Sequence, residues 1–166
     1  RSEQEGQRAL RLNAQPPPKG LVNGQSTSAW QGLREFRVTR REFEDRAHSQ
    51  CSFYLQPVDG QRLPSYSAGQ YLTFQLPSSQ LPHARKPAAA VLTRCYSLSD
   101  APNAASYRVT IKRALPPVSD SALPPGLVST YFLDRIREGD VINVGAPAGR
   151  FSINPASDIP VVLIAG

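Results

Sequence analysis

The sequence predicts a mainly β fold, a closed antiparallel barrel of six strands covered by one helix. Six short segments alternate apolar and polar residues, which is the pattern of strands with one buried face. Turns rich in proline and glycine separate these segments, and only one stretch among them has helical periodicity. A length of 166 residues is enough for one hydrophobic core.

Each strand is assigned from its own alternation and from the turn that ends it. The clearest is the fifth, in which Tyr107, Val109 and Ile111 alternate with polar residues. The second ends at Asp59-Gly60, a pair that is typical of a tight turn. The expected strands are Glu35 to Arg41, Cys51 to Pro57, Tyr71 to Leu76, Thr93 to Ser99, Tyr107 to Arg113, and Val141 to Ala146.

The expected helix runs from Ser129 to Glu138, with Ser129 or Thr130 as its N-cap. Gly139 follows it at the place of a C-cap glycine. Cations in the last turn suit the helix dipole there. The apolar stripe that the barrel would cover is Val128, Phe132 and Ile136, and the cations are Arg135 and Arg137.

The remaining segments define the domain organisation. Residues 1–32 are polar and proline-rich and are expected to be a linker or a disordered extension, whereas 33–158 form the barrel domain. Two proline-rich loops, Pro77 to Ala90 and Leu115 to Pro125, interrupt it; we expect mobility of the first and a role beside a cofactor for the second. The apolar run 159–166 is typical of the first strand of a parallel nucleotide-binding sheet that is cut short here.

Composition excludes several functions. The net charge of +6 is spread along the chain rather than gathered in a basic stripe, so nucleic-acid binding is not expected. Two isolated cysteines and two histidines do not make a metal site. No apolar run is long enough for a membrane span. The absence of a disulfide framework favours a reducing compartment, and we expect a cytoplasmic protein.

The segment Arg94-Cys95-Tyr96-Ser97 carries the strongest chemical signal. On a strand Arg94 and Tyr96 share one face, and Cys95 and Ser97 share the other. The segment therefore presents a guanidinium that can bind phosphate, a flat aromatic ring and a hydroxyl. A dinucleotide with a planar redox ring needs these groups at about this separation.

The start of the expected helix is the second candidate. No carboxylate lies in its first turn, and Gly126 just before it lets a ligand approach the backbone. A diphosphate would satisfy the free amides and gain from the helix dipole. On the residue pattern alone, an ordinary serine-capped helix with water on its first turn is the simpler interpretation.

Seven segments occur in the order found in the ferredoxin-NADP reductase superfamily, which the chain resembles from about residue 33 to residue 166. The resemblance is greatest to the reductase part of flavohaemoglobins and their globin-free relatives. The segments are Gly69-Gln-Tyr-Leu, Arg94-Cys-Tyr-Ser-Leu-Ser-Asp-Ala-Pro-Asn, Tyr107-Arg-Val-Thr-Ile-Lys-Arg, Gly126-Leu-Val-Ser-Thr-Tyr, Glu138-Gly-Asp-Val, Ala146-Pro-Ala-Gly-Arg-Phe and Pro160-Val-Val-Leu-Ile-Ala-Gly.

The resemblance implies a Greek-key barrel of the FAD-binding FR-type that holds FAD on its outer face. Arg94 would pair with the diphosphate, Tyr96 would stack on the isoalloxazine ring and Ser97 would hydrogen-bond near its N5. Tyr96 and Ser97 are therefore the expected catalytic residues. The other implied cofactor-binding residues are Tyr71, Cys95, the backbone of Ile111 and Lys112, and the helix start at Gly126, Leu127, Val128 and Ser129.

The implied activity is that of an NAD(P)H-dependent flavin oxidoreductase, in which FAD passes electrons from a nicotinamide cofactor to an acceptor. The NAD(P)-binding domain that would hold the nicotinamide cofactor follows Gly166 in the family, so this chain alone is expected to lack full activity. A haem or iron-sulfur acceptor would lie on other domains. Two alternatives remain: an FMN-binding member of the superfamily, or a non-catalytic β-barrel binding module.

Overall fold

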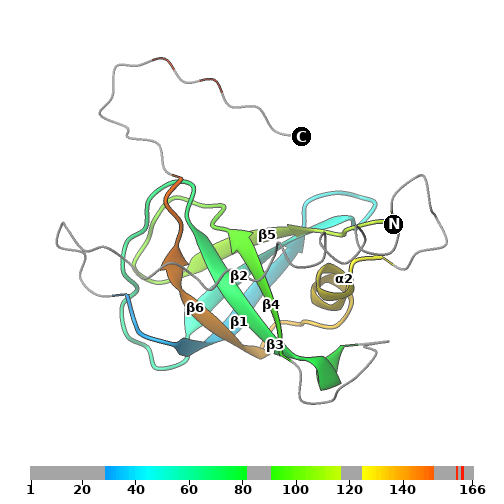
Figure 1. Cartoon of the computed structure of the whole chain (residues 1–166), viewed down its shortest axis with the longest axis horizontal. Helices are drawn as coiled ribbons and strands as arrows, with labels where there is room; N and C mark the ends of the chain where they lie inside the picture. The colour runs from blue at the N-terminus through cyan, green and yellow to red at the C-terminus, as the bar shows by residue number, and fades with distance from the viewer. Residues whose placement is uncertain (1–28, 82–90, 117–124, 152–159, 161, 163–166) are drawn as a thin grey trace, which may run out of the picture.

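The computed structural model describes residues 29–81, 91–116 and 125–151, together with 160 and 162. Six strands form one antiparallel sheet, in the order β4-β3-β6-β1-β2-β5, that curls into a barrel (Figure 1). The strands are β1 (Leu33–Phe43), β2 (Gln50–Pro57), β3 (Tyr71–Pro77), β4 (Val91–Ser97), β5 (Tyr107–Lys112) and β6 (Val141–Ala148). The short 3-10 turn η2 (Ser78–Gln80) and the helix α2 (Leu127–Asp134) complete the described elements.

Apolar side chains on alternate strand positions fill the barrel, as the sequence predicts. On β3, Leu72, Phe74 and Leu76 are buried and the residues between them are not. β5 shows the same alternation, and β1, β2 and β6 each direct at least two apolar side chains inward. The expected class, a six-stranded antiparallel barrel with one α-helix in the described chain, is therefore confirmed.

Strand β1 is long enough to pair with two neighbouring strands, each along a different part of its length. It pairs with β6 through Leu33–Arg37 and with β2 through Phe36–Phe43. A register shift at Thr39, between Val38 and Arg40, marks a β-bulge, which bends the strand and increases its twist.

The helix α2 lies at one end of the barrel and closes its core (Figure 1). Phe132 is fully buried and meets the edges of three aromatic rings, at 5.5 Å from Phe53, 5.3 Å from Phe74 and 5.6 Å from Tyr96. Val128 and Ile136 are buried as well. The predicted apolar stripe therefore faces the core.

The predicted ends of this helix are wrong. It begins at Leu127 with Gly126 as N-cap, because the Ser129 hydroxyl bonds Gly126 and Ala114 inside the first turn instead of capping. It ends at Asp134 with Arg135 as C-cap. Gly139, expected as the C-cap, lies in the turn before β6 with φ of +95°.

The two predicted last-turn cations also lie at or beyond the C-cap. The guanidinium of Arg137 nevertheless covers the helix end, since it donates to Asp134 O at 2.6 Å and Ile136 O at 3.0 Å. Asp134 O is one of the carbonyls that the C-terminus of this helix leaves without a partner inside the helix. Arg137, which lies beyond the end of the helix, thus supplies the positive charge that the C-terminal end of the helix dipole favours.

The folded unit begins before the predicted boundary at residue 33. Trp30 packs on the core, 5.5 Å from Phe36 and 6.4 Å from Tyr107, and its Nε1 donates to Val144 O at 3.1 Å. Four predicted segments lie wholly or largely outside the described residues: 1–28 of the predicted linker 1–32, most of the loop 77–90, residues 117–124 of the second loop, and nearly all of the predicted strand 159–166.

Replacing Phe132 by Ala is expected to lower the free energy of unfolding by about 3–5 kcal/mol, because it leaves a cavity among three aromatic rings. Tyr131→Ala is the matched control on the same helix, since Tyr131 is only partly buried. Urea unfolding followed by circular dichroism measures both. Equal losses in the two variants would contradict the central position given to Phe132.

The stability of the barrel is expected to fall between about pH 10 and pH 12. Burial raises the pKa of Tyr107 from 10.0 to about 12, while its hydroxyl donates to Pro64 O at 2.6 Å. The folded state thus holds this proton more tightly than the unfolded chain, so the stabilisation is complete below the unfolded pKa and is lost as the pH rises through the folded one. Thermal unfolding across this range should show a shallower fall in Tyr107→Phe than in the parent chain.

Candidate functional site

The Arg94–Ser97 segment occupies the last four residues of β4, opposite β3. Cys95 lies across from Thr73, with the sulfur 3.6 Å from the Thr73 hydroxyl, and Ser97 lies across from Tyr71. Tyr96 is partly buried against Phe74 and Phe132 on the other face. Burial of the ring raises the pKa of Tyr96, so its hydroxyl stays protonated at neutral pH.

The sheet is held closed at one point between its two end strands. Leu98 and Val109 form an isolated antiparallel bridge, and Ser99 N–H donates to Arg108 O at 2.9 Å. Within the described residues no strand pairing joins β4 to β5 beyond this bridge. The register of this bridge, continued along the two strands, places Cys95 of β4 opposite Lys112 of β5; we call the line between the two strands the β4–β5 seam.

The backbone groups on one side of each of the two strands are directed to this seam. Arg113 N–H donates to Ser49 O, so by antiparallel alternation Ile111 is directed to β2 and Lys112 away from it, toward the seam. By the same rule Leu98 N–H donates to Gln70 O, so Cys95 and Ser97 direct their backbone groups to the seam. The seam therefore offers amides and carbonyls in the plane of the sheet, where a flat heterocycle could bind.

The structure separates the two residues expected to contact the ring through their backbones. Ile111 is fully buried in the core and its backbone is directed to Cys51. Lys112 is exposed, and its amide is directed to the seam. A direct backbone contact to the ring can therefore come from Lys112, whereas Ile111 packs in the core and holds the strand in place.

The start of α2 has no side-chain cap and no acidic residue in its first turn. Its first intrahelical bond runs from Thr130 N–H to Gly126 O at 3.0 Å, which leaves the amides of residues 127–129 without partners inside the helix. Val128 and Ser129 are buried, while Gly126 and Leu127 are partly exposed. The turn can thus accept an anion at its open side.

Gly126 is needed for close packing as well as for access to the backbone. A Cβ there would lie 2.6 Å from Ala114 Cβ and 3.0 Å from Ser129 Oγ. Gly126 N–H also donates to Ala114 O at 2.7 Å. The glycine therefore fixes the start of α2 on the segment that follows β5.

Tyr71 of the segment that begins at Gly69 packs against the turn at Gly149, which follows β6. A Cβ at Gly149, which has φ of +120°, would lie 3.2 Å from the Tyr71 ring. Because Tyr71 is paired with Ser97, the turn after β6 lies beside the same end of β4. Gly149 thus lies beside the candidate site, although the sequence analysis did not name it as a site residue.

Positive charge at the site is not neutralised by neighbouring carboxylates. The ion pairs between described residues are Arg34–Asp59, Arg40–Glu42 and Arg113–Asp134, so neither Arg94 nor Lys112 takes part in one. Arg94 is exposed, and its guanidinium donates to Thr93 O at 2.7 Å but to no carboxylate among the described residues. By contrast, the hydrogen-bonded Arg113 lowers the pKa of Asp134. Two cations are left to attract an anionic ligand.

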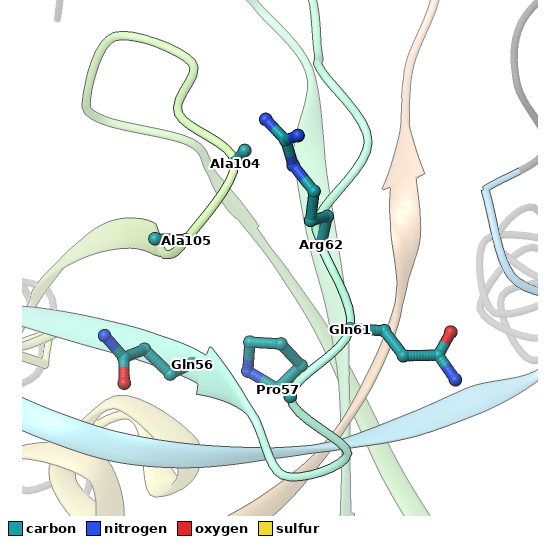
Figure 2. A pocket seen from close by; sticks show the side chains of 7 residues that line it. Gln56, Pro57, Gln61, Arg62, Ala104 and Ala105 are labelled. Atoms are coloured by element: carbon teal, nitrogen blue, oxygen red, sulfur yellow. The ribbon is translucent and has the colours of Figure 1, made fainter.

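One hollow of the described chain lies away from these residues. It encloses about 360 Å³, and Figure 2 shows Arg62 extending beside the segment that carries Ala104. It shares no residue with the seam or the start of α2. Its lining residues are Gln56, Pro57, Gly60, Gln61, Arg62, Ala104 and Ala105.

Metal binding and membrane insertion find no support in the described ranges. These residues contain no group of three or more His, Cys, Asp or Glu side chains that could hold a metal ion. No helix in the same part of the chain is long and apolar enough to cross a bilayer.

Comparison with known proteins places this geometry in a family, although no protein-family model matches the chain. A flavohemoprotein of Halalkalibacterium halodurans is 40% identical over 144 residues, which is 86% of this chain and 32% of that protein. The crystal structure of the flavohem-like FAD/NAD-binding domain of nitric oxide dioxygenase from Vibrio cholerae is 32% identical, with a TM-score of 0.59 over 73% of this chain and 46% of the other.

Phthalate dioxygenase reductase, described as a modular structure for electron transfer from pyridine nucleotides to a [2Fe-2S] centre, is 25% identical, with a TM-score of 0.51 over 75% of this chain and 32% of that one. The chain belongs to the ferredoxin-NADP reductase superfamily, as its barrel domain. Within the superfamily it matches the reductase part of flavohemoproteins, and it spans about a third of the length of these curated relatives.

Gly126→Ala is expected to destabilise the chain by about 1–3 kcal/mol, because the new methyl group overlaps Ala114 Cβ. The double variant Gly126→Ala, Ala114→Gly should recover part of that loss. Gly145→Ala is the matched control, since a Cβ there meets Thr73 at an ordinary 3.4 Å. Urea unfolding compares the variants; a loss no greater than that of the control would contradict the packing role.

Proposed function

We propose that this chain is the FAD-binding domain of an NAD(P)H-dependent flavin oxidoreductase. The observation that carries the proposal is the placement, on one barrel, of an open seam lined by backbone amides and of an uncapped helix start that follows β5. The free cations Arg94 and Lys112 add attraction for a diphosphate. These are the groups that a flavin dinucleotide requires.

Each proposed role follows from the position of the side chain. Arg94 binds the diphosphate together with the turn from Gly126 to Ser129. Tyr96, whose ring is already fixed by Phe74 and Phe132, packs on the isoalloxazine ring, and Tyr71 lines the same site. Tyr71 is held in turn by Gly149.

Groups along the β4–β5 seam would contact the polar edge of the isoalloxazine ring. The Ser97 hydroxyl hydrogen-bonds near N5, and the Lys112 and Cys95 backbones contact the remaining polar atoms, with Ile111 as support. A flavin bound here would supply the electron-transfer chemistry, namely hydride acceptance and one-electron transfer. The protein residues bind and orient it, and none of them is required as a general acid or base.

The donor and the acceptor would lie on other parts of a longer protein. We propose a nicotinamide cofactor held by an NAD(P)-binding domain after residue 166, and a haem or iron-sulfur acceptor, because relatives are named flavohemoprotein and a reductase that serves a [2Fe-2S] centre. We also propose a cytoplasmic location. Both cysteines are free thiols in the structure, which is in keeping with a reducing compartment.

The 166-residue chain is expected to bind FAD and to quench its fluorescence. Arg94→Ala should weaken binding by about 1.5–3 kcal/mol, the contribution of a charge-assisted hydrogen bond, and Arg62→Ala, an arginine of the remote pocket, should not. Fluorescence titration gives the affinities, and mass spectrometry of the bound chromophore distinguishes FAD from FMN. A folded chain that binds neither flavin at high micromolar concentration would exclude the proposal and favour a non-catalytic barrel.

A further inference from the structure

A chain of hydroxyl groups crosses the outer face of β2 and β5 and ends where the barrel closes. The Ser52 hydroxyl donates to Glu44 Oε1 at 2.5 Å and lies 2.7 Å from Thr110 Oγ1. Thr110 Oγ1 in turn lies 2.9 Å from Ser99 Oγ. Three hydroxyl groups and one carboxylate thus form one continuous hydrogen-bonded line across the sheet.

The middle of this line is shielded from water although it lies outside the barrel core. Ser52 is fully buried, Thr110 and Ser99 are half-buried, and Glu44 is exposed. The neighbouring Tyr54 ring lies between two guanidinium groups, with Arg40 at 4.9 Å and Arg108 at 5.9 Å from its centre. A hydrogen bond that is shielded from water is stronger than an exposed one, so the bond between Ser52 and Thr110 holds β2 and β5 firmly together at this point.

Ser99 is held by more than its hydroxyl group. Its N–H donates to Arg108 O at 2.9 Å, and its carbonyl accepts from Arg108 Nε at 3.1 Å. Every polar group of Ser99 is therefore bonded to β5. This residue fixes the bridge between Leu98 and Val109 from its closed side.

The same residues lie one step from the proposed flavin contacts. Ser99 follows Ser97 by two positions, and Thr110 precedes Lys112 by two, so each pair lies on one side of its strand. The open seam begins directly beyond the bridge. A small change in the distance between Ser99 and Thr110 is therefore passed along two stiff strands to the seam.

We propose that Thr110 and Ser99, with Ser52 and Glu44 behind them, are positioning residues that set the width of the β4–β5 seam and so align the Ser97 hydroxyl and the Lys112 amide against the flavin ring. This inference rests on the proposed function. Apolar side chains could also fill this space. Hydroxyl groups differ because each bond has a fixed length and direction, so they specify one separation of the strands.

Thr110→Val tests the proposal, because valine keeps the shape of threonine and removes the hydroxyl. Thr110→Ser keeps the hydroxyl and should restore the parent behaviour. Thr39→Val is the matched control, since Thr39 is exposed at the bulge of β1 and bonds only Tyr54 O, at 3.3 Å. All variants are made in the 166-residue chain.

The first measurement needs no flavin. In Thr110→Val the Ser99 amide, which bonds Arg108 O, is expected to exchange with solvent about 2- to 10-fold faster, as loss of one hydrogen bond implies. The Val38 amide, bonded to Asp140 O away from the seam, serves as the reference within the same spectrum. An unchanged Ser99 exchange rate overturns the proposal.

The second measurement uses the FAD-loaded chain. Thr110→Val is expected to lower FAD affinity about 3- to 10-fold and to change the ratio of oxidised to reduced affinity about threefold, a shift of roughly 15 mV in midpoint potential at ~30 mV per factor of ten for two electrons. Thr110→Ser and Thr39→Val should keep the parent values. Faster exchange with unchanged affinity and potential overturns the alignment role but leaves FAD binding intact. Absence of FAD binding by the folded parent overturns the proposed function itself.

Discussion

The structure depends on how the two end strands of one sheet meet. Five of the six strand contacts are hydrogen-bonded ladders, two of them with a register shift, whereas β4 and β5 meet only at the bridge between Leu98 and Val109 in the described chain. Full pairing along this line would have satisfied every backbone group and left nothing for a ligand to bind. A single bridge closes the core and leaves a row of donors and acceptors open. The single bridge therefore both closes the barrel and leaves the candidate site open between β4 and β5.

The helix completes what the strands leave open. Its buried face seals the end of the barrel through Phe132, while its uncapped start remains accessible beside Gly126. The ion pair between Arg113 and Asp134 holds the far end of the helix to the residue that follows β5. Both ends of α2 are thus fixed relative to β5, so packing determines the distance between the helix start and the seam.

Period-two patterns located all six strands, because a barrel strand with one buried face must alternate. The segment from Arg94 to Ser97 could likewise be read from its residue types. The ends of α2 could not be predicted from the residue types. Ser129 has a hydroxyl group that could cap the helix, but this hydroxyl accepts a hydrogen bond from Ala114 N–H, a contact that depends on tertiary packing. Thr110 and Ser99 were missed for a similar reason: their hydroxyl groups meet only after the barrel has closed, and nothing in either local pattern distinguishes them from ordinary surface residues.

The bulged strand β1 has a consequence for how this domain can vary in length. Phe36 and Arg37 of this strand pair with two neighbours at once, β6 on one side and β2 on the other. One residue added or removed there would turn the side chains of both ladders to the wrong face together. Insertions and deletions among homologues should therefore be rare in this part of β1 and concentrate in connections outside the strand ladders.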